Sequence, residues 1–120
     1  MDVKKTKTLL NNWIQAIQTE DPKQVIPLYD KTAILVPTLS NKVCNTQEKI
    51  KAYFDHFLQK KPKCTINECH IQTIESLGIA SGIYTFTVQD QTTVQARYSF
   101  VFSLQTTKIL NHHSSMMPES

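Results

Sequence analysis

The sequence contains only two glycines, Gly78 and Gly82, and it has no long apolar run. Two separate glycines cannot form the glycine-rich loop that cradles phosphate groups, so we do not expect nucleotide-dependent chemistry. Three cysteines, Cys44, Cys64 and Cys69, are an odd number without the spacing of a disulfide scaffold, so we expect reduced thiols. A bilayer crossing needs roughly 18 apolar residues, and a secretory signal also needs an apolar segment. We therefore expect a cytoplasmic protein without a membrane partner.

The chain also lacks a strong charge imbalance and the common catalytic motifs. Its formal net charge is +3, and lysines cluster in two short groups, at residues 4–7 and 60–63. The aromatic residues follow core periodicity and do not interleave with basic side chains, which argues against nucleic acid as a partner. No HExxH motif, nucleophile elbow or Ser-His-Asp spacing is present. Cys64, Cys69 and His70 match no common zinc signature, so we predict no metal site.

Apolar spacing in the first half of the chain predicts three helices. The first helix has one apolar stripe, made by Leu9, Leu10, Trp13, Ile14 and Ile17. Asp21 can cap a second, short helix, because Pro22 suits its first position. Asn45 or Thr46 can cap a third helix. The apolar face of this third helix is made by Ile50, Tyr53, Phe54, Phe57 and Leu58.

The second half of the chain is rich in β-branched and aromatic residues, which indicates strands. We predict four strands, at residues 65–75, 79–89, 93–104 and 108–115, and a brief earlier strand at 33–36. The connections between the four are short, so consecutive strands should be antiparallel neighbours.

The order of these elements predicts the fold class. We expect a single α+β domain over residues 1–120, with three N-terminal helices packed on one face of a strongly curved antiparallel sheet. A twisted sheet covered by helices leaves a conical hollow at its open end, which is a common place for a ligand site.

The last predicted strand contains two adjacent histidines. Because side chains alternate along a strand, His113 and Ser115 share one face, and His112 and Ser114 share the other. One reading is that one histidine is exposed and the other is a hydrogen-bonded residue of the sheet. The functional reading places one imidazole in the hollow beside hydroxyl groups.

Three further side chains each have a structural and a functional interpretation. Arg97 lies in an otherwise apolar and hydroxylic strand, so its guanidinium either reaches solvent or meets an anion. Tyr53 belongs to the apolar face of the third helix, either in the core or with its hydroxyl towards a ligand. Thr38 can bond its own backbone in a turn or contribute a hydroxyl to the site.

Several segments together resemble the iota-class carbonic anhydrases. This class belongs with the calcium/calmodulin-dependent kinase II association-domain relatives in the nuclear-transport-factor-two-like superfamily. The resemblance covers Trp13 to Glu119, and its most specific part is the closing segment. The segments that carry it are Leu35–Ser40, Tyr53–Leu58, Ser81–Phe86, Ala96–Val101 and His112–Glu119.

The resemblance implies a cone-shaped barrel, a homodimer and the reversible hydration of carbon dioxide to bicarbonate. It implies that four catalytic side chains surround a bicarbonate pocket, namely Thr38, Tyr53, His113 and Ser115. It also implies a substrate-binding group that we take to be Ser114, Arg97 and Tyr98. We expect no cofactor, with zinc or manganese as the alternative that some relatives suggest.

The mechanism that follows is general-base hydration. In it, Thr38, Tyr53 and Ser115 hold carbon dioxide and bicarbonate, while His113 orients or deprotonates the attacking water. The alternative function is a non-catalytic association domain that forms oligomers and binds a small carboxylate. A third possible function is that of another enzyme with its site in the same pocket, such as an isomerase or hydrolase, because a fold does not fix a function.

Overall fold

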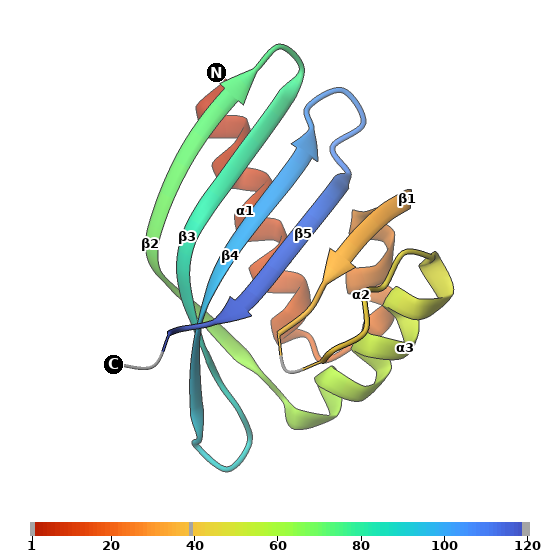
Figure 1. Cartoon of the computed structure of the whole chain (residues 1–120), viewed down its shortest axis with the longest axis vertical. Coiled ribbons are helices and arrows are strands. Elements are labelled where there is room, and N and C mark those ends of the chain that lie inside the picture. The colour runs from red at the N-terminus through yellow and green to blue at the C-terminus, as the bar shows by residue number, and fades with distance from the viewer. Residues whose placement is uncertain (1, 39, 119–120) are drawn as a thin grey trace.

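A five-stranded sheet with helices on one face is formed by the residues that the structure describes, 2–38 and 40–118. In this computed structural model the strand order is β1-β5-β4-β3-β2. Figure 1 shows the first helix, α1 (Asp2–Gln18), crossing behind the strands, while the opposite face of the sheet is uncovered. The predicted α+β class, with helices packed on a curved sheet, is confirmed.

The helix α1 packs against the strands β2 and β3 through its apolar stripe. The buried members of the stripe include Leu10, Trp13 and Ile17, which recur at helical spacing. Near its N-terminus the helix comes so close to β3 that a Cβ on Gly78 would lie 2.1 Å from the Thr6 Oγ1 atom. Glycine at this position therefore allows the helix to lie directly on the strand.

The shorter helices begin where side chains cap them. The Asp21 carboxylate accepts from the Lys23 backbone N–H at 2.9 Å, which starts α2 (Pro22–Val25), and η1 (Ile26–Leu28) follows. The Thr46 hydroxyl accepts from the Lys49 N–H at 3.2 Å, which starts α3 (Gln47–Phe57) and then η2 (Leu58–Lys60). The cap at Asp21 is thus confirmed, and of the two predicted caps for the third helix the structure selects Thr46.

Four strands follow as antiparallel neighbours, in agreement with the prediction from their short connections. They are β2 (Lys63–Ile74), β3 (Leu77–Thr87), β4 (Thr93–Ser103) and β5 (Ile109–Met116). The register between β2 and β3 shifts between Ile66 and Glu68, where a Cβ on Gly82 would lie 2.0 Å from the Glu68 carbonyl oxygen. This close backbone approach is possible because residue 82 has no side chain.

The first strand, β1 (Tyr29–Val36), is longer than predicted and pairs parallel with β5. The sheet is therefore mixed, whereas we expected an antiparallel one. The prediction failed at this edge because periodicity along a strand does not encode the direction of its partner. This partner lies about 80 positions later, with Leu35 opposite His112 and Val36 opposite His113.

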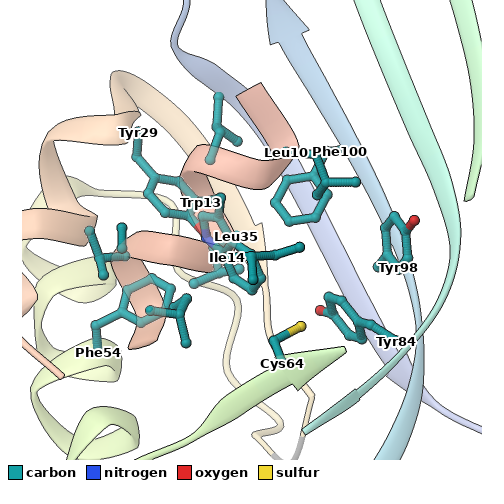
Figure 2. Close-up of a cluster of buried hydrophobic side chains, with 14 of the residues drawn as sticks. Leu10, Trp13, Ile14, Tyr29, Leu35, Phe54, Cys64, Tyr84, Tyr98 and Phe100 are labelled. Carbon is teal, nitrogen blue, oxygen red and sulfur yellow. The ribbon is translucent and has the colours of Figure 1, made fainter. Parts of the chain in front are cut away.

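The core lies between the helices and the inward face of the sheet. Figure 2 shows Trp13 of α1 between Tyr29 and Phe100, and the Trp13 and Phe100 ring centroids are 5.1 Å apart. The outward face of β4 and β5 carries exposed side chains such as Arg97, Ser99 and His113. Among the described helices, none is both long and apolar enough for a membrane crossing.

Candidate functional site

A cavity of about 810 Å³ is lined by α3, the end of β1 and the inward face of β3 and β5. Its walls are mainly apolar and aromatic, and they include Trp13, Leu35, Phe54, Phe57, Phe86 and Val94. Its exposed polar residues mark the mouth, and they are His56, Gln59, Lys60, Gln89, Asp90 and Thr92. Its buried polar residues mark the inner end, and they are Thr38, Tyr84, His112 and Ser114. We refer to these last four side chains as the inner polar cluster.

His112 is the centre of the inner polar cluster. Its side chain is only 3% exposed, and its ring stacks on Phe100 with the centroids 3.9 Å apart. Its Nδ1 atom lies 2.8 Å from the Tyr29 hydroxyl, and its Nε2 atom lies 3.2 Å from the Tyr84 hydroxyl. The Tyr29 oxygen also accepts from the Trp13 indole N–H at 3.1 Å. Both ring nitrogens of His112 are therefore engaged by protein groups.

Three hydroxyl groups extend this series of hydrogen bonds from His112 towards the cavity. The Tyr84 hydroxyl donates to the Ser114 Oγ at 2.7 Å, and Ser114 in turn shares a hydrogen bond with Thr38. Thr38 belongs to the segment that follows β1, and Ser114 belongs to β5, so the parallel pairing of these two strands brings the hydroxyls together. No described buried side-chain nitrogen or oxygen is left without a hydrogen-bond partner.

The inner polar cluster is uncharged at neutral pH. Burial, with a smaller contribution from His113, lowers the pKa of His112 to about 3, so its imidazole stays neutral. Burial also raises the pKa of Tyr84 and of Tyr29 well above the usual value for a phenol. The inner end can therefore offer neutral hydrogen-bonding groups to a ligand, and it offers no general base at neutral pH.

Tyr53 lies on the wall of the cavity. Its ring stacks on Phe57 with a centroid distance of 5.6 Å, and burial raises the pKa of its hydroxyl. The hydrogen bonds of the described residues include none from this hydroxyl. Thr38, Tyr53 and Ser114 of the predicted site therefore line one cavity, and the structure adds Tyr84 and His112, which we did not predict there.

The predicted placement of His113 and Ser115 in the hollow is wrong. Both lie on the outward face of the sheet, where His113 is exposed and pairs across the strands with Ser99, and Ser115 pairs with Arg97. Alternation along β5 was correctly expected, but the inward side chains are those of His112 and Ser114. The reason is that His112 lies opposite Phe100, whose side chain belongs to the core.

Arg97 and Tyr98 also lie outside the cavity lining, which corrects their prediction as substrate-binding residues. Arg97 is exposed on the outward face of β4. Tyr98 points inward, but its hydroxyl donates to the Glu68 carbonyl at 3.0 Å, beside the irregularity in β2. That hydroxyl is thus engaged by a backbone carbonyl of β2.

No three His, Cys, Asp or Glu side chains lie close enough to hold a metal ion, as far as residues 2–38 and 40–118 are concerned. His112 and His113 point to opposite faces of the sheet, and Cys44, Cys64 and Cys69 are free thiols. These residues therefore do not provide the ligand set that zinc or manganese would need.

Helices packed on an open, curved sheet with a cavity between them define the NTF2-like class of α+β proteins. The family model described as the calcium/calmodulin dependent protein kinase II association domain matches residues 3–118, so the chain belongs to this family. No curated protein matches the chain.

Solved structures agree with this assignment. A protein from Xanthomonas campestris that is assigned to the same association domain is 40% identical, with a TM-score of 0.87 over 95% of this chain and 86% of that chain. An NTF2-like protein from Pseudomonas putida is 12% identical, with a TM-score of 0.85 over 98% and 87%. A protein from Streptomyces avermitilis, assigned as a dehydratase of the NTF2-like family, is 12% identical, with a TM-score of 0.81 over 98% and 97%. At 12% identity these last two share the fold alone.

Proposed function

We propose that the chain binds a small molecule in the cavity, with an apolar body against the aromatic walls and a neutral carbonyl oxygen at the inner end. The observation that carries this proposal is the buried Thr38–Ser114 hydroxyl pair in the lining of a largely apolar cavity of about 810 Å³. Ligand sites of this kind are typically apolar clefts of roughly 300–1,000 Å³ with a few convergent polar groups.

The chemistry of the walls and of the inner end supports this class of ligand. Aromatic side chains such as Phe54, Phe57 and Phe86 favour an apolar body, because its burial removes apolar surface from water. At the inner end the hydroxyls of Thr38 and Ser114 suit an oxygen acceptor. The charged lining residues Lys60 and Asp90 are exposed, so an anionic group is better accommodated near the mouth than deep inside.

Two probes of the same shape test this proposal. Cyclohexyl methyl ketone carries one acceptor oxygen, and isopropenylcyclohexane carries a methylene group in its place. A neutral hydrogen bond is worth about 0.5–1.5 kcal/mol, so we expect the ketone to bind roughly two- to tenfold more tightly by NMR titration. The double variant Thr38→Val with Ser114→Ala, which removes both hydroxyls, should reduce this preference. Equal affinities of the two probes for the unmodified protein would contradict the proposal.

The second candidate function is the reversible hydration of carbon dioxide to bicarbonate. The observation that favours it is the group of hydroxyls from Thr38, Ser114 and Tyr53 along one cavity, which can hydrogen-bond the oxygens of bicarbonate. The resemblance to iota-class carbonic anhydrases supports the same substrate. Bicarbonate would fill only a small part of the cavity, so this function ranks second.

The hydration mechanism needs a different base from the one predicted. His113 lies on the outward face, and His112 has a pKa of about 3 with both ring nitrogens bonded to tyrosines. Hydroxide or water from solvent would therefore attack, while the hydroxyls stabilise the charge that develops on the carbon dioxide oxygens. The rate should then rise with pH without a histidine inflection between about pH 5 and 8.

Stopped-flow hydration with stringent chelation, and then with added zinc or manganese, tests this candidate. Activity that is lost in Ser114→Ala and retained in His113→Ala would support the cavity as the site. Absence of activity under all these conditions would reject the enzyme function and leave the binding function in place.

We also propose that the chain forms a homodimer through the outward face of β3, β4 and β5. This face is not covered by a helix, and it mixes half-buried apolar residues such as Ile79 and Val101, which pair across the strands, with polar ones such as Ser99 and Arg97. The name of the family, an association domain, supports self-association of this chain. A cytoplasmic location and the absence of nucleic acid and membrane partners are part of the same proposal.

A further inference from the structure

We propose that Tyr29, which does not line the cavity, fixes the direction of the hydrogen bonds through His112 and so leaves one hydroxyl proton of the Thr38–Ser114 pair for a ligand. The direction of these hydrogen bonds is inferred from contacts within the core. Its consequence for the ligand rests on the proposed binding function.

The first step is at Tyr29, whose hydroxyl proton can reach one acceptor. The Trp13 indole N–H is only a donor, and it donates to the Tyr29 oxygen at 3.1 Å. The proton of Tyr29 must therefore go to the Nδ1 atom of His112 at 2.8 Å. If Nδ1 carried a proton of its own, the buried hydroxyl proton of Tyr29 would have no acceptor, which is unfavourable in the core. His112 thus carries its proton on Nε2.

The second step, at the other side of the ring, agrees with this direction. The Nε2–H group donates to the Tyr84 oxygen at 3.2 Å. Tyr84 donates to the Ser114 Oγ at 2.7 Å, so its single proton is not available for Nε2. Both tyrosines therefore require the same tautomer of His112, with Nδ1 as acceptor and Nε2 as donor.

The third step is a count of protons at the cavity. Ser114 and Thr38 have two hydroxyl protons, and one of them forms the bond between the two oxygens. Because Tyr84 supplies its own proton to Ser114, the second proton of the pair remains for a group in the cavity. With the opposite tautomer, Tyr84 would donate to His112 and accept from Ser114, and no proton would remain. The ligand class that follows is one with an unprotonated oxygen at the inner end.

The direction can be measured in the protein without any ligand. Long-range proton–nitrogen NMR spectra of the histidine-labelled chain distinguish a protonated ring nitrogen from a free one, and His112→Asn identifies the signal. The expected result is a single Nε2–H tautomer at neutral pH. An Nδ1–H tautomer or an imidazolium ion would overturn the proposal.

The role of Tyr29 is tested by Tyr29→Phe, with Tyr98→Phe as the matched control. Each change removes one phenol hydroxyl from the core. The Tyr98 hydroxyl donates to the Glu68 carbonyl and takes no part in the hydrogen bonds through His112. Without the Tyr29 hydroxyl, either tautomer leaves Nδ1 without a partner, so we expect a measurable Nδ1–H population. In Tyr98→Phe the single Nε2–H tautomer should remain. An unchanged tautomer in Tyr29→Phe would overturn the role of this residue.

The two ketone and alkene probes then separate the possible failures. We expect the ketone preference of roughly two- to tenfold to decrease in Tyr29→Phe and to persist in Tyr98→Phe. Equal binding of both probes to the unmodified protein, together with an Nε2–H tautomer, would reject the proposed ligand class. The inferred direction of the hydrogen bonds through His112 would then still hold. A preference in Tyr29→Phe equal to that of the unmodified protein would reject the inference about Tyr29 and leave the binding function intact.

Discussion

His112 is surrounded by aromatic rings, with the Phe100 centroid at 3.9 Å, the Trp13 centroid at 5.3 Å and the Tyr29 centroid at 6.2 Å. Such surroundings favour the neutral imidazole, because a charge there would be separated from water. The proposed direction of its two hydrogen bonds also needs a neutral ring, because Nδ1 then accepts from the Tyr29 hydroxyl. Folding and proton binding are therefore linked at this position.

The pH dependence of stability should show this linkage. The pKa of His112 is about 3 in the folded chain, and an unfolded histidine has a pKa of about 6.5, so the unfolded state binds an extra proton between these values. The free energy of unfolding should therefore be unaffected above about pH 6.5 and fall below it, by at most ~1.4 kcal/mol per pH unit. Urea unfolding between about pH 7 and 5 measures this slope.

His112→Asn is the informative variant for this prediction, and His113→Asn is its control. His112→Asn removes one group that takes up a proton on unfolding, so the free energy of unfolding should depend less steeply on pH. His113→Asn changes an exposed side chain of the outward face and should retain the slope of the unmodified protein. Equal slopes in His112→Asn and in the unmodified protein would contradict the linkage.

The sequence allowed a partial prediction of the site at the residue level. Alternation correctly separated His112 and Ser114 from His113 and Ser115, but it does not say which of the two faces is inward. Asn111, on the face of His113, was the available signal, since three polar side chains at alternate positions indicate the solvent face. Tyr29 and Trp13 could not be assigned to the site, because the hydrogen bond from Tyr29 to His112 joins segments far apart in the sequence and Trp13 bonds to Tyr29.

At the level of elements, the glycines hold β3 close to its neighbours. A Cβ at residue 78 would meet the side chain of Thr6, whereas a Cβ at residue 82 would meet the backbone carbonyl of Glu68. A side chain can rotate away, but a backbone carbonyl within a sheet cannot move without loss of register. The two positions should therefore differ in their tolerance of a methyl group.

We expect Gly82→Ala to destabilise the protein more than Gly78→Ala. Overpacking costs about 1–3 kcal/mol, and the backbone contact at residue 82 should lie at the upper end of this range. Urea unfolding of the two variants measures the difference. The double variant Thr6→Ala with Gly78→Ala should recover part of the loss at residue 78. An equal loss in both single variants would show that the backbone at residue 82 can relax.

Helices and hairpin strands were predicted well because their signals are local. Caps such as Asp21 and Thr46 and the spacing of apolar residues depend on a few neighbouring positions. The parallel pairing of β1 with β5 depends on two segments at opposite ends of the chain, and a single sequence carries no local signal for it. That pairing is also what brings Thr38 to Ser114, so the site could not be completed before the topology was known.

At the level of the whole molecule, the proposed homodimer makes the outward face of the sheet its interface. Light scattering during size-exclusion chromatography should give twice the chain mass of 13.7 kDa. Ser99→Glu, on the exposed centre of that face, should shift the mass towards one chain, because two like charges would meet across the interface.

Thr8→Glu, on the exposed side of α1, introduces the same charge elsewhere and should leave the dimer mass unchanged. A monomer mass for the unmodified protein would reject the homodimer. A dimer that persists in Ser99→Glu and dissociates in Thr8→Glu would place the interface on the helical side.

Trp13 is the single tryptophan of the chain, and it belongs both to the buried core and to the wall of the cavity. Its fluorescence therefore arises from one known position that exchanges rigid aromatic neighbours for water on unfolding and that a bound molecule would touch. The native chain thus carries an intrinsic optical probe, whose emission can follow both denaturation and occupancy of the cavity without any label.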